Sequence, residues 1–154
     1  NHKEQKIYNT EEKILAGELI LDPFIRGNVV EEWINSGWVK HCHARSAIPN
    51  NPLNIYGKHP DGTLGRGIQY PFKKPNNDEY HSLWEEKLLD PWKVCILKLM
   101  KYHAQDPKSK LGQISTEFIP NTDYGEGCKY SLFEQGVECT KWMRNNWEKI
   151  KTET

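Results

Sequence analysis

Two segments with the features of buried β-strands constrain the fold of this chain more than anything else in its sequence. The first, 38–45, comes directly after a helical segment and is too short before Pro49 to form another good helix. The second, 113–119, is stopped by Pro120. Helical segments lie before, between and after the two, and such alternation is typical of a parallel α/β protein.

The helical segments are marked by apolar residues spaced three and four apart and by capping residues at their ends. Asp22-Pro23 interrupts the first helix, Gly37 ends the second, and Ser131 with Glu134 forms a capping box that opens the last. A stripe on the helix that begins at Asp90 is expected to pack on the sheet; it consists of Trp92, Cys95, Ile96, Leu99, Met100 and His103. Helices are therefore expected at 11–21, at 28–36, from Asp78, from Asp90 and at 131–150.

Two strands are too few for a self-sufficient parallel sheet, which is normally buried on both faces. A complete (β/α)8 barrel takes about 250 residues, whereas this chain has 154. We therefore expect 1–154 to be a single partial domain, either the C-terminal portion of a larger α/β fold or a chain that completes its sheet with another polypeptide. The start at Asn1, with neither an initiator methionine nor a signal peptide, also predicts a chain that begins within a longer protein.

Charge and composition exclude several classes of partner. The 21 basic residues balance the 21 acidic ones, so no net charge attracts nucleic acid. No stretch approaches the roughly 18 apolar residues of a membrane span. The 4 cysteines form no CxxC pair and are too sparse for a disulfide scaffold, which favours a reducing, cytoplasmic setting. Cys42, between His41 and His43, is expected to be a small packed residue and not a zinc ligand.

The carboxyl ends of the two strands carry residues that suit metal chemistry. Alternation places His41, His43 and Arg45 on one face of the first strand, and Ser115 and Glu117 on one face of the second. Catalytic side chains of barrels come from these strand ends. His43 and Glu117 could bind a divalent ion such as Mn²⁺, Mg²⁺, Co²⁺ or Zn²⁺, and the Arg45 fork could hold a phosphate or a sugar oxygen. The alternative is an inward-facing histidine beside a Glu117–Arg45 salt bridge, without metal.

A resemblance is carried by motifs in a fixed order. His41-Cys42-His43-Ala44-Arg45-Ser46 comes first, Asp78-Glu79-Tyr80 stands before a Trp-bearing helix, and Thr116-Glu117-Phe118-Ile119-Pro120 precedes a final Trp-bearing helix. From about Trp38 to Trp147, the chain resembles the sugar phosphate isomerase/epimerase family of xylose-isomerase-like TIM barrels. Family members typically show His-Ile-His-Ala-Arg on the seventh strand and Glu-Phe-Gly-Pro on the eighth. The resemblance implies the C-terminal portion of a TIM (β/α)8 barrel, about three βα units.

The resemblance also implies a partial metal site. The family binds one divalent metal through two Glu, one Asp and one His. By that resemblance His43 is the histidine ligand, Glu117 is the last glutamate and also a catalytic base, and His2 assists near the metal. The remaining Glu and Asp ligands would precede residue 1. Two departures, Ile119 and Ala47 where the family has Gly, point to an altered substrate pocket.

The function that follows is a metal-dependent sugar or sugar-phosphate isomerase/epimerase, which transfers a proton through an enediolate. With two of its ligands missing, the chain alone would be inactive and would require the upstream N-terminal half of the barrel, or self-association, to complete the fold. The alternative is a non-catalytic interaction or binding chain that keeps part of the barrel framework. An endonuclease of the same barrel type is disfavoured by the zero net charge.

The long segment 46–77 is rich in Pro, Gly and Asn and lacks helix or strand patterns. It could be a lid that brings positive charge to a sugar phosphate, or an ordinary solvated loop. Its glycines match no phosphate-binding fingerprint, because no strand closely precedes them and no helix follows. The proposed lid would carry the basic residues and histidine Lys58, His59, Arg66, Lys73 and Lys74 and the aromatic residues Tyr56, Tyr70 and Phe72.

Overall fold

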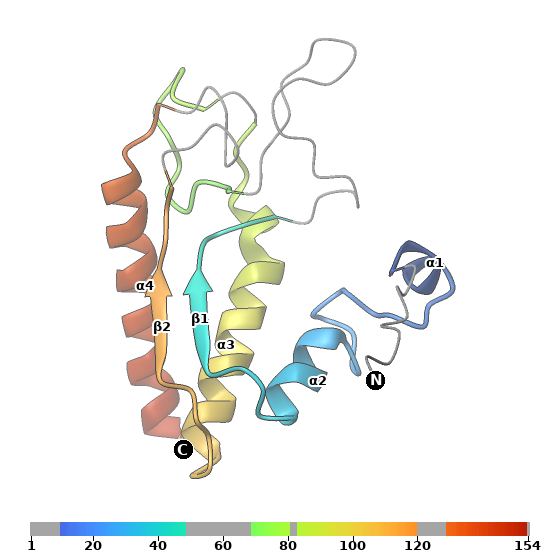
Figure 1. Ribbon diagram of the computed structural model, residues 1–154. Coiled ribbons are helices and arrows are strands. Elements are labelled where there is room, and N and C mark those ends of the chain that lie inside the picture. Colours follow the sequence, from blue (N-terminus) through green and yellow to red (C-terminus); the bar gives the residue numbers. More distant parts are fainter. Residues whose placement is uncertain (1–9, 49–68, 81–82, 120–128, 154) are drawn as a thin grey trace, which may run out of the picture.

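The computed structural model describes residues 10–48, 69–80, 83–119 and 129–153. Helices and strands alternate along them in the predicted order (Figure 1). The helices are α1 (Thr10–Leu15), α2 (Val29–Asn35), α3 (Asp90–Gln105) and α4 (Leu132–Glu153), the strands are β1 (His41–Ala44) and β2 (Gln113–Thr116), and a 3₁₀ helix, η1 (Glu86–Leu89), leads into α3.

The strands pair in parallel, as the helix–strand alternation predicts. Their register places His43 opposite Ser115 and Ala44 opposite Thr116. Both strands are shorter than the segments proposed from sequence, since Arg45 and Glu117 lie just beyond their ends. Parallel pairing brings these two ends to the same edge of the sheet.

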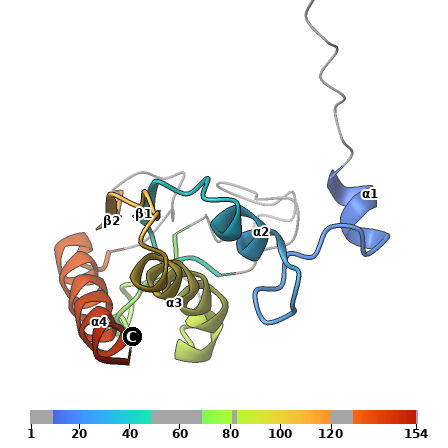
Figure 2. The same cartoon turned by 90° about the horizontal axis from the view of Figure 1, so that it is seen from below.

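Helices α3 and α4 lie on one side of the two-stranded sheet, as the view along the strands shows (Figure 2). The apolar stripe of α3 packs there as predicted, with Ile96, Leu99 and Met100 buried. Alternation along β1 directs Cys42 and the fully buried Ala44 toward the helices. One buried cluster joins sheet and helices: Ala44, Ile96, Met100, Cys139, Met143 and Ile150.

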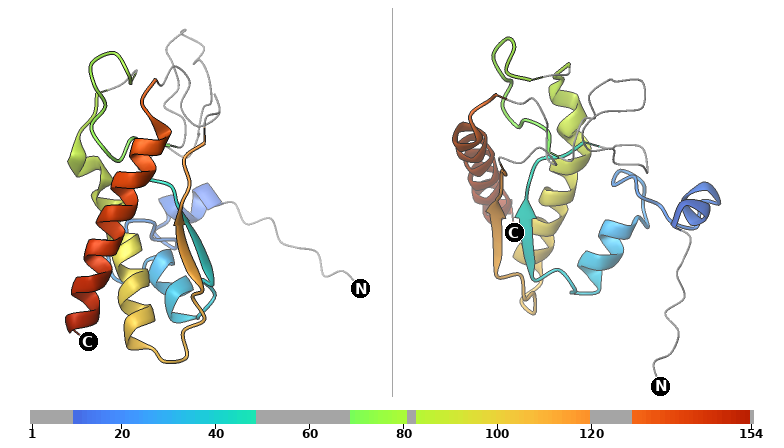
Figure 3. Two further views of the ribbon diagram at one scale, coloured as in Figure 1. Left: turned by 90° about the vertical axis from the view of Figure 1, so that its left-hand side faces the viewer. Right: turned by 45° about the horizontal axis from the view of Figure 1, so that its top comes forward.

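The other sheet face points away from α3 and α4 (Figures 2 and 3), and its exposed residues are polar. His41, His43 and Gln113 are exposed on it, and Ser115 is partly exposed. This is the alternation predicted for His41 and His43. A parallel sheet normally has both faces covered, whereas no helix or strand that the structure describes covers this one.

The Gly37 end of α2 and the Ser131 cap of α4 are confirmed, and α2 also has an N-cap, Asn28, that the sequence pattern did not indicate. The Asn28 side-chain oxygen accepts hydrogen bonds from the backbone N–H groups of Val30 and Glu31, each at 3.1 Å. After α2, Gly37 adopts a left-handed conformation with φ of 68°. At the start of α4, the Ser131 hydroxyl accepts a hydrogen bond of 3.2 Å from the Glu134 N–H.

Two helix predictions are wrong. The first helix ends at Leu15, not near Leu21, because the chain turns at Gly17, where φ is 72°. No helix begins at Asp78: its φ of 65° is left-handed, and the Asn76 N–H donates to the Glu79 carboxylate at 2.8 Å in a local turn. The acidic side chain that suggests a helix cap therefore belongs to a turn.

The described end of the long segment is anchored to the core. Tyr70 is 2% exposed, and its N–H donates to the Ser46 carbonyl at 2.9 Å. Phe72 packs against Trp92 and Trp142, with ring centroids 5.8 and 5.9 Å away. Tyr70 and Phe72 are therefore packed residues and not part of a lid.

The basic residues proposed for that lid are only partly within the structure. Lys73 forms an exposed ion pair of 3.0 Å with Glu134, and Lys74 is exposed. Tyr56, Lys58, His59 and Arg66 lie outside the described residues, so the lid stays a prediction. Within the described chain, no helix combines the length and apolar character needed to cross a bilayer.

Candidate functional site

The carboxyl ends of β1 and β2 bring together three of the site residues proposed from sequence. His43 ends the polar row of β1, Arg45 follows that strand, and Glu117 follows β2. His43 and Glu117 are 74 residues apart in the sequence, yet His43 Nδ1 lies 3.1 Å from Glu117 Oε2. The parallel register produces this contact, because it aligns the two strand ends.

Glu117 is the centre of the cluster. Its Oε2 accepts a hydrogen bond of 2.5 Å from Arg45 Nη2 in addition to the His43 contact. The side chains are 57% exposed for His43, 33% for Glu117 and 17% for Arg45. The histidine thus faces solvent, whereas the arginine is largely enclosed beside the carboxylate.

The polar row continues along the sheet face away from the strand ends. The His41 ring meets the His43 ring edge to face, with centroids 4.7 Å apart. Ser115 Oγ lies 3.5 Å from His41 Nε2. A substrate above this face would therefore meet imidazole, hydroxyl and carboxylate groups in one row.

The cluster offers half of a metal site. An imidazole and a carboxylate in contact are suitable ligands for a divalent ion. Among the residues that the structure describes, no group of three or more His, Cys, Asp or Glu side chains could hold a metal. Further ligands would have to come from elsewhere, and His2, the remaining residue proposed for catalysis, lies outside the described residues.

The ion pair expected under the metal-free alternative is present. Arg45 and His43 contact the same oxygen of Glu117. Glu117 Oε1 and His43 Nε2 have no hydrogen bond to a described residue. The Arg45 charge beside Glu117 would oppose the approach of a cation to this carboxylate.

The described cysteines lie away from this cluster, on the helix side of the sheet. Cys42, Cys95 and Cys139 are free thiols. Burial raises the pKa of all three, and that of Cys139 reaches about 12. Cys139 also lies 3.8 Å from the Ala44 carbonyl. These thiols act as packing groups, as expected for Cys42.

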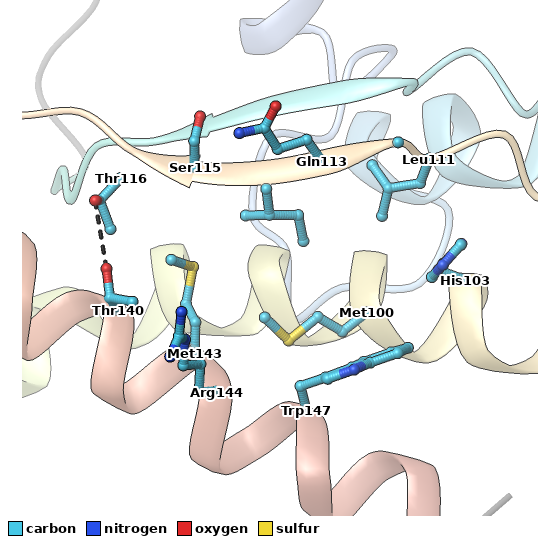
Figure 4. Close-up of a pocket in the computed structure, with 12 residues that line it drawn as sticks. Met100, His103, Leu111, Gln113, Ser115, Thr116, Thr140, Met143, Arg144 and Trp147 are labelled. Carbon is cyan, nitrogen blue, oxygen red and sulfur yellow. Dashed lines mark hydrogen bonds between the residues drawn. The ribbon is translucent and has the colours of Figure 1, made fainter.

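The sequence did not indicate a groove beside the edge of β2 that lies away from β1. It has a volume of about 540 Å³ and lies between β2 and the helices α3 and α4 (Figure 4). His103, which the sequence places in the stripe expected to pack on the sheet, is partly buried there: its ring stacks on Trp147 at 5.7 Å and its Nδ1 lies 2.9 Å from Ser109 Oγ. Residues of β2, α3 and α4 form the groove only after the elements pack, so no local signal predicts it.

Comparisons with known proteins do not place the chain in a family. No protein-family model, no curated protein and no solved structure matches it. The geometry of His43, Arg45 and Glu117 is therefore the observation on which a function must rest.

Proposed function

We propose that this chain carries part of the active site of a metal-dependent sugar or sugar-phosphate isomerase/epimerase. The observation that supports it is the 3.1 Å contact between His43 and Glu117 at the carboxyl ends of two parallel strands. Those are the strand ends at which barrel enzymes place their chemistry. The resemblance of the flanking motifs to the sugar phosphate isomerase/epimerase family leads to the same proposal.

Each residue has a distinct role in the proposed reaction. Glu117 takes the proton next to the sugar carbonyl and returns it at the neighbouring carbon or on the opposite face. Arg45 holds the Glu117 carboxylate in place and presents positive charge to a sugar or phosphate oxygen. His43 supplies an exposed imidazole at the same carboxyl end of the sheet.

His43 and Glu117 would hold a divalent ion, Mn²⁺, Mg²⁺, Co²⁺ or Zn²⁺, together with ligands from outside the described residues. When bound, such an ion polarises a substrate carbonyl as a Lewis acid. The proposed additional ligands come from the upstream N-terminal half of a TIM barrel, or from self-association of the chain. The sheet face opposite α3 and α4 carries exposed polar residues and has no covering helix or strand among the described residues, which supports such a completion.

The second candidate is a non-catalytic interaction or binding chain that keeps part of the barrel framework. The Arg45–Glu117 ion pair favours it, since it already neutralises the carboxylate. The two candidates differ in one measurable property: only the enzyme requires His43 and Glu117 to bind a metal.

Mn²⁺ titration by isothermal calorimetry tests the proposal. With two protein ligands we expect weak binding, with a Kd on the order of 1 mM. The variants His43→Ala and Glu117→Gln should abolish it. His41→Ala is the matched control, because His41 lies in the same polar row without a contact to Glu117, and it should leave binding unchanged. Equal binding in His43→Ala, Glu117→Gln and the parent chain would refute the metal assignment and favour the second candidate.

We also propose that the protein works in the cytoplasm. The described thiols Cys42, Cys95 and Cys139 are all free, which suits a reducing compartment.

A further inference from the structure

The outer edge of β2 combines an unpaired strand edge with an adjoining groove. β1 pairs with only one edge of β2. Along the other edge, alternate N–H and C=O groups point outward with no partner among the described residues. Proteins usually protect such an edge with proline, charged side chains or a bulge. β2 has none of these, since its four residues are Gln, Ile, Ser and Thr.

Helix α4 lies on the helix side of the sheet and extends outward past this edge of β2. In the view along the strands, α4 is displaced outward beyond β2, whereas α3 lies beneath the sheet (Figure 2). The 540 Å³ groove lies above α4, with Met100, Met143 and Trp147 among its lining (Figure 4). A segment paired with β2 would therefore have apolar side chains beneath it.

A second hollow extends the groove toward the start of α4. Its lining includes Phe118, Phe133 and Val137. Both hollows are lined by Thr116, Thr140 and Arg144, so they adjoin each other along the strand, where the Thr116 and Thr140 hydroxyls lie 3.4 Å apart. Phe133 is 81% exposed and adds a large apolar side chain to this lining. An elongated groove next to a row of backbone groups suits an extended chain better than a compact small molecule.

The groove is positively charged at its middle. Arg144 is exposed, lines both hollows and forms no ion pair with a described residue. Lys141, one turn earlier, is already paired with Glu138 at 2.8 Å. Arg144 is thus the cation that is available to a bound segment, and a carboxylate would complement it.

We propose that the outer edge of β2 binds an extended peptide segment that adds a strand to the sheet. Its alternate side chains that face α4 are apolar, except for one acidic residue that pairs with Arg144. The inference does not use the His43–Glu117 contact, because the groove lies on the helix side of β2 and that contact lies at the strand ends. It concerns the edge that a completed (β/α)8 barrel would pair with its next strand, so a barrel strand and a separate peptide would compete for it.

Synthetic peptides of about ten residues, a usual strand length, provide the test. Valine and threonine alternate in them, and one valine position carries Asp, Asn or Lys. Binding is measured by fluorescence anisotropy, and amide hydrogen exchange of 112–117 is followed by NMR. We expect the Asp peptide to bind at least ten-fold more tightly than the Lys peptide and to protect the outward amides of β2.

Two variants and a peptide with methylated amides distinguish strand addition from other modes of binding. Arg144→Glu should reverse the preference to the Lys peptide, whereas Lys149→Glu, an equal charge change at an exposed position of the same helix, should not. Methylation of alternate peptide amides should abolish binding. Equal binding of the methylated peptide, unchanged β2 amides, or β2 protection already present in a dimer of the chain without peptide would each overturn the proposal. Because Mn²⁺ binding is measured separately, failure here leaves the isomerase proposal to its own test.

Discussion

Arg45 and Glu117 form the closest charged contact at the strand ends, with Arg45 Nη2 2.5 Å from the Glu117 oxygen that also contacts His43. One carboxylate oxygen of Glu117 thus contacts both the Arg45 guanidinium and the His43 imidazole. In the proposed enzyme this contact orients the base, and in the alternative it is only a structural ion pair. The two interpretations predict different effects when the cation is removed.

Arg45→Met should strengthen Mn²⁺ binding by about ten-fold, because it removes a positive charge beside the proposed ligands and releases Oε2 of Glu117. Titration calorimetry measures the change. The variant should also lower the free energy of unfolding by about 1 kcal/mol, since a partly buried charged hydrogen bond is lost. Lys73→Met, which removes the exposed pair with Glu134, is the control and should change neither property appreciably. Unchanged Mn²⁺ binding in Arg45→Met would favour the purely structural ion pair.

Asn28→Ala should lower the free energy of unfolding by about 1–2 kcal/mol. The Asn28 side chain is fully buried, caps α2 at two backbone N–H groups, and donates a 2.7 Å hydrogen bond to the Ile25 carbonyl. Urea denaturation followed by circular dichroism gives the value. Asn35→Ala, at the exposed last residue of the same helix, should change it by less than about 0.5 kcal/mol. Equal effects of the two substitutions would contradict the capping role.

Cys139 should make the chain less stable at high pH. Burial raises the pKa of its thiol from 9.0 to about 12 in the folded state. Below pH 9 both folded and unfolded states keep the proton, so the folded state has its full advantage. As pH rises from about 9 toward 12, only the unfolded state loses the proton, and stability falls by at most about 1.4 kcal/mol per pH unit for this group.

Urea denaturation of the parent chain and of Cys139→Ala, at a series of pH values from 8 to 11, checks this. The variant is less stable at every pH because it leaves a small cavity, but its stability should fall less steeply above pH 9. Cys95→Ala is the control: burial also raises the Cys95 pKa, but this thiol is only half-buried, so its removal should reduce the slope less. If the free energy of unfolding falls with pH equally steeply in the parent chain and in Cys139→Ala, the buried thiol has no part in the pH dependence.

Much of the fold could be predicted because its signals are local. Gly37 ends α2, Ser131 opens α4, and the alternation of His41, Cys42, His43 and Ala44 assigns the two faces of β1. The helix proposed at Asp78 failed for a physical reason: the same short acidic side chain that caps helices also tolerates the left-handed conformation of a turn.

The sequence by itself determined the order of strands and helices, their parallel pairing and which strand residues are polar, because periodicity and capping depend on neighbours along the chain. Only the tertiary structure decided that one oxygen of Glu117 meets both Arg45 and His43, that His103 stacks on Trp147, and that α4 leaves a groove beside β2. These contacts join residues from different elements. They depend on strand register and helix position, which are set by the packing of the whole core and by no local pattern.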